Sequence, residues 1–229
     1  SSAASDVYMR QAPDSGASSR SRRSRLRTWA SSGFAIIVMA VGVMWLVEII
    51  DTVVLDDWLQ GGGIHPRRAD GLDGIVWAPL LHSDFAHVFS NAVPLLVMGG
   101  LVSVRGFRYW AVVTGSIVVV GGFFTWLLAG GSNHVGASGV VFGYFGALLS
   151  AAWFERKAAA LGAALLAIFL YSGIVAGLVP QDGLSWEGHL FGFIAGAVAA
   201  RVMAEPREYR DPDDPGDVQP WELDEPWLG

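Results

Sequence analysis

The chain has 229 residues, of which 52% are hydrophobic and only 16% are charged, and its mean hydropathy is +0.43. An ordinary soluble domain of this length is less apolar, so the composition excludes that class and indicates a compact polytopic membrane protein. The formal net charge of -6 says little about partners, because the charged residues lie mostly at the two ends. Cysteine is absent, which excludes a disulfide framework, a thiolate nucleophile and a cysteine-based metal site.

Both ends of the chain differ in composition from its middle. Residues 1–32 are rich in Ser and Arg, and we expect a disordered, basic cytoplasmic arm there. A secretory signal would have a small-residue cleavage site where this chain has Glu48 to Asp51, so we interpret residues 33–50 as an uncleaved helix. Residues 204–229 are acidic and contain Pro, which predicts a solvated cytoplasmic tail. The expected membrane domain is therefore residues 33–203.

Six apolar segments are candidates for membrane spans, each of which needs about 20 residues to cross about 30 Å of hydrocarbon. They predict an all-α bundle of six transmembrane helices at residues 33–53, 77–102, 109–130, 138–153, 159–178 and 186–203. If the N-terminus is on the cytoplasmic side, most Lys and Arg residues also lie on that side, and only Arg67 and Arg68 lie outside. The positive-inside rule thus predicts a multi-pass protein of the cell membrane with both termini in the cytoplasm.

Ser138 and His189 open the fourth and sixth predicted spans, near their outer ends. Polar side chains in such segments are costly and usually functional. At 1.5 Å per residue the short fourth span covers only about 24 Å. Its N-terminus is therefore expected below the outer surface, in a hollow that is lined by protein and reached by water. Such a hollow suits hydrolysis and opens to the outer face.

Small residues recur on these two spans, at Gly139 and Gly143 and at Gly188, Gly192 and Gly196. This spacing lets two transmembrane backbones approach closely, and helix packing alone is enough to explain it. The same approach would bring the Ser138 hydroxyl within hydrogen-bond reach of His189, which can accept its proton. The free backbone N–H groups at the start of the fourth span could also stabilise an oxyanion.

Histidines on the second span offer two further interpretations. His87 and Asn91 are four residues apart, hence on one helical face, and as paired donors they suit an oxyanion hole. A metal site built from His82, His87, His134 and His189 is the alternative, which we favour less because no histidine pair lies at i, i+4 with an acidic partner. We expect neither a metal nor another cofactor. His82 is expected to be a structural hydrogen bonder, and His134 beside Asn133 to line the outer mouth.

Taken in order, these motifs resemble those of the rhomboid family of intramembrane serine proteases, over residues 77–203. The ordered set is His87-x-x-x-Asn91, then Gly136-Ala137-Ser138-Gly139, then His189-x-x-Gly192-x-x-x-Gly196. The resemblance implies that Ser138 is the nucleophile and His189 the base and later the acid, a dyad without an aspartate. It implies an oxyanion hole of His87, Asn91 and the Ser138 backbone N–H, with Gly136, Gly139, Phe142, Gly192 and Gly196 in supporting positions.

By the same resemblance, the partners are the lipid bilayer and other membrane proteins, cut near the outer end of a transmembrane helix after a small residue. The fifth span and the loop of residues 180–185 would move to admit them. No nucleic acid partner is expected, and no feature of the sequence specifies an oligomeric state.

The chain departs from the family pattern at a few positions. Phe142 stands where a Tyr often stacks on the catalytic His, so we expect the stacking to survive and the hydrogen bond of the hydroxyl to be lost. Gly188 stands where Ala is common, and residues 63–67 differ from the Trp-Arg element of some relatives.

Two other functions are alternatives to proteolysis. A rhomboid-like protein that binds membrane clients without cutting them typically lacks the Ser or the His, whereas this chain keeps both. A transporter or channel is opposed by the lack of an evident inverted repeat and of an intramembrane carboxylate to couple ions.

Overall fold

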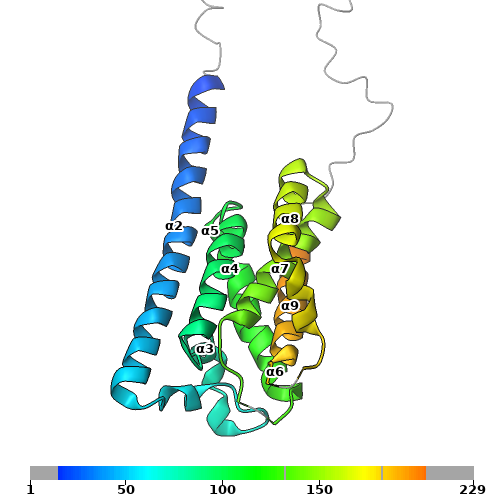
Figure 1. The fold of residues 1–229 in the computed structure, drawn as a ribbon. Coiled ribbons are helices and arrows are strands. Elements are labelled where there is room, and N and C mark those ends of the chain that lie inside the picture. Colours follow the sequence, from blue (N-terminus) through cyan, green and yellow to red (C-terminus); the bar gives the residue numbers. More distant parts are fainter. Residues whose placement is uncertain (1–14, 132, 182, 205–229) are drawn as a thin grey trace, which may run out of the picture.

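The computed structural model describes residues 15–131, 133–181 and 183–204, and only the backbone of residues 15–31. All regular elements in these ranges are helical (Figure 1). The elements are α2 (Ser15–Ile50), η1 (Asp51–Leu55), η2 (Leu59–Gly62), η3 (Ala69–Gly71), α3 (Gly74–Trp77), η4 (Ala78–Leu80), α4 (Phe85–Ser103), α5 (Phe107–Ser116), η5 (Ile117–Gly121), α6 (Gly122–Leu128), α7 (Ser138–Glu155), α8 (Ala158–Tyr171), η6 (Ser172–Leu178) and α9 (Trp186–Val202).

Four stretches of the described helices are long and apolar enough to cross a membrane, where the sequence predicted six. They are Ser32–Leu55, Phe85–Ser103, Phe107–Leu128 and Ala158–Leu178. At the expected fourth and sixth spans lie α7 and α9, of 18 and 17 residues. α9 is shorter than the four apolar stretches, and the Gly and Ser residues of α7 lower its hydropathy.

Two expected boundaries differ from the structure. The second span was expected from residue 77, but α4 begins at Phe85, because the Asp84 carboxylate caps it by accepting the N–H of His87 at 2.8 Å. The short helices α3 and η4 take up the preceding residues. At the N-terminus, α2 begins at Ser15, so part of the arm expected to be disordered is helical. The apolar residues that follow already form a helix, so the costly nucleation step is complete. Extending that helix backwards by further residues requires only propagation.

α7 runs through the middle of the bundle, with 12 of its 18 residues buried. It packs along α9 through glycines, as the spacing of small residues predicted. A Cβ on Gly192 would overlap the carbonyl oxygen of Gly139, and a Cβ on Gly196 would overlap that of Gly143. This contact between backbones sets how closely the N-terminal turns of the two helices approach each other.

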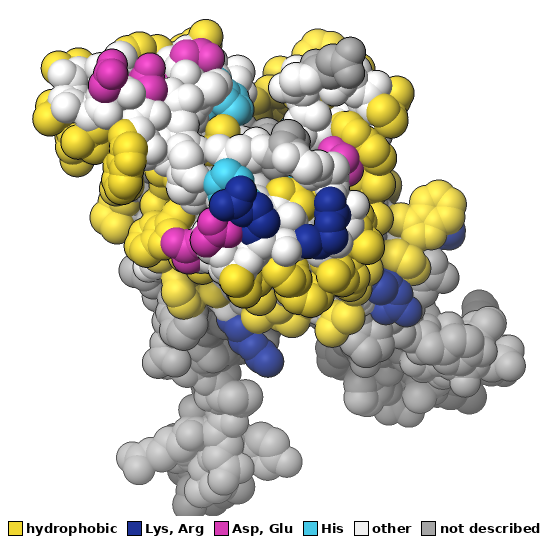
Figure 2. Space-filling model, turned by 90° about the horizontal axis from the view of Figure 1, so that it is seen from below, with side chains coloured by type: hydrophobic (Ala, Val, Ile, Leu, Met, Phe, Trp, Pro, Cys, Tyr) yellow, Lys and Arg dark blue, Asp and Glu magenta, His cyan; other side chains and the backbone are white. Residues whose placement is uncertain are grey.

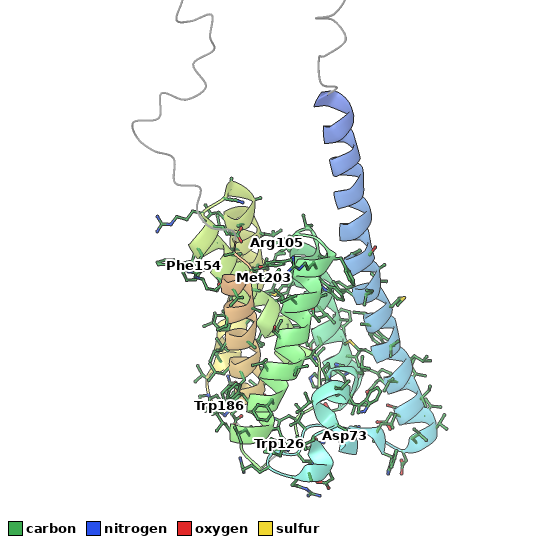
Figure 3. The ribbon with its side chains drawn as sticks, turned by 180° about the vertical axis from the view of Figure 1, so that it is seen from behind. Asp73, Arg105, Trp126, Phe154, Trp186 and Met203 are labelled. Carbon is green, nitrogen blue, oxygen red and sulfur yellow. The ribbon has the colours of Figure 1, made fainter. Side chains whose placement is uncertain are left out.

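The two ends of the bundle differ in chemistry. Figure 3 shows Asp73, Trp126 and Trp186 at one end and Arg105, Phe154 and Met203 at the other. We call the first the loop end, because the segments 56–73, 129–137 and 179–185 meet there. Charged and histidine side chains gather on its face, and hydrophobic side chains surround them (Figure 2). This distribution suits a face in contact with water above apolar flanks in contact with lipid.

Hydrogen bonds between loops hold the loop end together. Ile64 and His134 pair as an antiparallel bridge, with N···O distances of 2.9 and 3.0 Å. The Arg67 guanidinium donates to the carbonyl of Ala129 at 2.6 Å, and the Asn133 amide donates to that of Gln60 at 2.6 Å. The loop before α7 is thereby fixed to the loop after α2, which positions the start of α7.

Candidate active site

Ser138 is the first residue of α7, and the loop before it is held from two sides. Gly136 has a φ of +106°, a conformation that side-chain-bearing residues rarely adopt, and its N–H donates to the carbonyl of Ala78 at 2.9 Å. The N–H of Ala137 donates to Nε2 of His82 at 3.5 Å, and His82 is buried. His82 therefore has the structural hydrogen bond that the sequence predicted for it. The turn presents Ser138 at a helix N-terminus, where backbone N–H groups are free.

Nε2 of His189 lies 2.8 Å from Oγ of Ser138. His189 is on the first turns of α9 and only 4% exposed, although 51 residues separate it from Ser138 along the chain. The glycine contacts between α7 and α9 place these two side chains within hydrogen-bond distance. The geometry is that of a nucleophile and its base.

The other ring nitrogen of His189, Nδ1, lies 2.8 Å from the carbonyl oxygen of Gly177 in η6. A carbonyl can only accept, so Nδ1 carries the proton and Nε2 has a free lone pair for the Ser138 hydroxyl. The nearest acidic residue in sequence, Glu187, accepts instead from the N–H of Gly130 at 3.0 Å. The sequence did not indicate Gly177 for this role, because an acceptor on the backbone leaves no residue pattern.

The ring of Phe142 stacks on the imidazole of His189, with centroids 4.1 Å apart and planes 7° apart. The stacking expected of Phe142 in place of Tyr is thus present. Phe142 is one turn after Ser138 on α7, and both rings are buried. The contact fixes the plane of the imidazole, while its two hydrogen bonds fix the rotation within that plane.

His87 and Asn91, from α4, face the loop before Ser138. A Cβ built on Gly136 would lie 2.7 Å from Nε2 of His87 and 3.7 Å from Nδ2 of Asn91. The Asn91 amide donates one hydrogen to the carbonyl of His87 at 2.9 Å. Because an amide NH₂ has two hydrogens, its second one remains for another acceptor. Both side chains therefore adjoin the turn that carries Ser138.

These side chains line one open cavity of about 460 Å³. Its wall includes His87, Ser90, Asn91, Ser138, Phe142, Tyr171, Gly177 and His189. One wall comes from α4, one from α7 and α9, and one from the end of α8 and η6. The Ser138 hydroxyl thus lies at the wall of an open cavity.

His134, which the sequence predicted at the mouth of the site, lies at the loop end and joins two loops by a hydrogen bond. Nδ1 of His134 lies 2.5 Å from Oγ of Ser185, directly before α9. Burial lowers the pKa of His134, while the carbonyl of Gly130 and the charge of Glu187 act in the opposite direction. Burial thus favours the neutral form of the ring where the segment 129–137 meets the segment 179–185.

The fold and this set of side chains define a helical membrane protein with a serine beside a histidine. Comparison with known proteins agrees: the family model described as the Rhomboid domain matches residues 71–206, more than half of the chain. The chain belongs to the rhomboid family, whose members are generally intramembrane serine proteases.

The curated relatives are uncharacterised mycobacterial proteins. The chain is 36% identical over 188 residues to a protein of Mycobacterium tuberculosis, covering 78% of each chain. It is 32% identical over 192 residues to a protein of Mycobacterium leprae, covering 80% of this chain and 75% of the other.

Proposed function

We propose that this protein is an intramembrane serine endopeptidase that cuts transmembrane segments of other membrane proteins with a Ser138–His189 dyad. The observation that carries the proposal is the 2.8 Å contact between Oγ of Ser138 and Nε2 of His189, with Nδ1 engaged by Gly177. This arrangement leaves the basic nitrogen facing the hydroxyl, as nucleophilic catalysis requires.

In the first half of the reaction, Oγ of Ser138 bonds to the carbonyl carbon of the scissile peptide and its proton passes to Nε2 of His189. The tetrahedral oxyanion then collapses, the C–N bond breaks, and His189 gives that proton to the leaving amine. In the second half, water attacks the acyl-enzyme and loses its proton to His189, which returns it to Ser138 as the acid product leaves. The carbonyl of Gly177 holds His189 in the required tautomer and accepts from the imidazolium that forms.

The oxyanion is stabilised in this mechanism by the backbone N–H of Ser138 and by the side chains of His87 and Asn91. Each adjoins the turn at Gly136, where the substrate carbonyl would lie. Hydrogen-bond donors that are held in place before the reaction stabilise the negative charge of the oxyanion more strongly in a site from which water is excluded.

The proposed topology has six spans, the four apolar stretches together with α7 and α9, in the cell membrane. Both termini are cytoplasmic, and the loop end faces outward. The arginines at the far end include Arg105, which pairs with the buried Glu155 and lies 4.2 Å from the ring centroid of Tyr109. A cavity between α4 and η6 lets a substrate helix enter from the bilayer and unwind beside Ser138.

Covalent labelling by a fluorophosphonate tests the proposal on detergent-purified protein. Ser138 attacks phosphorus, fluoride leaves, and His189 takes the hydroxyl proton, so labelling reports an activated serine without a known substrate. We expect labelling of wild type and none of Ser138→Ala or His189→Ala. Ser90→Ala is the matched control, since Ser90 lines the same cavity, and it should label normally. Folded wild type that does not label would instead favour a protein that binds membrane clients without cutting them.

A further inference from the structure

The imidazole of His87 contacts the side chain of Ser83, which has no part in the proposed reaction. Oγ of Ser83 lies 3.1 Å from Nδ1 of His87, the nitrogen opposite the one that faces Gly136. On its other side, Ser83 Oγ lies 3.0 Å from Oδ2 of Asp84. The hydroxyl therefore lies between a carboxylate and the imidazole, and it can give its single hydrogen to only one of them at a time.

Asp84 is a fixed anchor rather than a freely rotating surface carboxylate. Its second oxygen, Oδ1, accepts the backbone N–H of His87 at 2.8 Å and so caps α4. The cap fixes Oδ2, which positions the Ser83 hydroxyl, and this hydroxyl in turn reaches Nδ1 of His87. The three side chains form one chain of contacts that ends beside the loop before Ser138.

A hydroxyl is suited to this place because it can both donate and accept. When Nδ1 of His87 carries no proton, the hydroxyl donates to it, and the proton of the neutral ring is then on Nε2, which can donate beside Gly136. When Nδ1 is protonated, the hydroxyl accepts from it and gives its own hydrogen to Asp84. Without Ser83, rotation of the ring about its bond to Cβ is opposed only by packing, including the edge contact with the ring of His82 at 5.0 Å.

We propose that Ser83 is a positioning residue of the oxyanion site, which holds the ring of His87 so that Nε2 faces the backbone at Gly136. The inference rests on the proposed function, since the benefit of an aimed donor is realised when negative charge develops beside it. Loss of Ser83 should slow the chemical step rather than weaken binding, because the hydrogen bond that His87 donates is strongest in the transition state, when the oxyanion forms.

The test measures fluorophosphonate labelling of Ser138 as a function of probe concentration, which separates the rate at saturation from the half-saturating concentration. We expect Ser83→Ala to lower the rate at saturation by about two- to tenfold, the range of one net hydrogen bond, with the half-saturating concentration unchanged. Ser83→Thr keeps the hydroxyl and should restore most of the rate. Ser103→Ala, which removes a hydroxyl that donates to the carbonyl of Gly100 at the other end of α4, is the matched control.

A double-mutant cycle tests whether Ser83 acts through His87. In a His87→Ala background, Ser83→Ala should cause no further loss, and an undiminished loss there would overturn the proposal, as would wild-type labelling by Ser83→Ala itself.

A second readout does not depend on activity. In protein labelled with ¹⁵N-histidine, Ser83→Ala should move the Nδ1 resonance of His87, which is assigned by its absence in His87→Ala. An unmoved resonance would overturn the contact even where wild type labels. A moved resonance in protein that does not label would support the contact and count against the proposed function instead.

Discussion

The carbonyl oxygen of Gly177 lies 2.8 Å from Nδ1 of His189, so the segment η6 holds the ring whose other nitrogen contacts Ser138. In triads an aspartate has this place. Here a neutral backbone acceptor fixes the tautomer, and its position depends on where η6 lies. Any movement of η6 away from α9 would release the proposed base.

Gly177→Ala tests this dependence. A Cβ at residue 177 would lie 2.6 Å from Cζ of Phe142 and 3.2 Å from Nδ1 of His189, so either η6 or the Phe142 ring must shift, and each of these movements disturbs a contact that holds His189. We expect the rate of fluorophosphonate labelling to fall on the order of tenfold, as for loss of one charge-assisted hydrogen bond. The control is Gly173→Ala in the same segment, where a Cβ meets nothing within 4 Å. Equal rates for the two variants would contradict the role of Gly177.

Phe142→Leu tests the stacking on His189. The substitution keeps an apolar side chain of similar size and removes the aromatic face, which contributes about 1 kcal/mol, or roughly a fivefold change in rate. We expect slower labelling with little change in thermal stability. Phe191→Leu, on α9 two residues after His189, is the matched control, because its ring pairs with Phe124. Labelling as slow in Phe191→Leu as in Phe142→Leu would indicate a general packing effect.

Much of this site could be predicted from the sequence, because side chains with a chemical function leave a pattern there. Ser138 and His189 stand out as polar residues in apolar segments, and the glycine spacing predicts their approach. The partner of Nδ1 of His189 could not be predicted, since it is a backbone atom. Ser83 lies four residues before His87, a spacing that could have indicated the contact.

The sequence predicted the helical fold but was less accurate about which helices are apolar enough to span a membrane and where one of them begins. Apolar length identifies helices that face lipid, but α7 has 12 of its 18 residues buried in protein, and α9 is only 17 residues long. The start of α4 depends on a cap at Asp84 and not on where the apolar run begins. Local capping therefore decided a boundary that hydropathy placed eight residues too early.

Gly196→Ala tests whether close packing of α7 on α9 holds the fold. The added Cβ would overlap the carbonyl oxygen of Gly143, so the helices must separate. We expect a loss of about 1–3 kcal/mol in the free energy of unfolding, typical of overpacking, measured by denaturation in detergent. Gly115→Ala on α5, where a Cβ meets nothing within 4 Å, should be neutral or stabilising. Stability equal to wild type in Gly196→Ala would show that the contact adapts.

His134 predicts a dependence of stability on pH. Burial lowers its pKa below the ordinary value of 6.5, so the unfolded chain binds a proton more readily than the folded protein does. The stability is thus complete above pH 6.5 and falls as the pH drops below that value. We expect the thermal midpoint in detergent to decline from about pH 7 to about pH 5, and to decline less in His134→Gln. Gly131→Ala in the same loop adds no ionisable group, and its Cβ meets nothing within 4 Å, so it is the control and should keep the wild-type slope. An unchanged slope in His134→Gln would mean that the contact with Ser185 tolerates a charged ring.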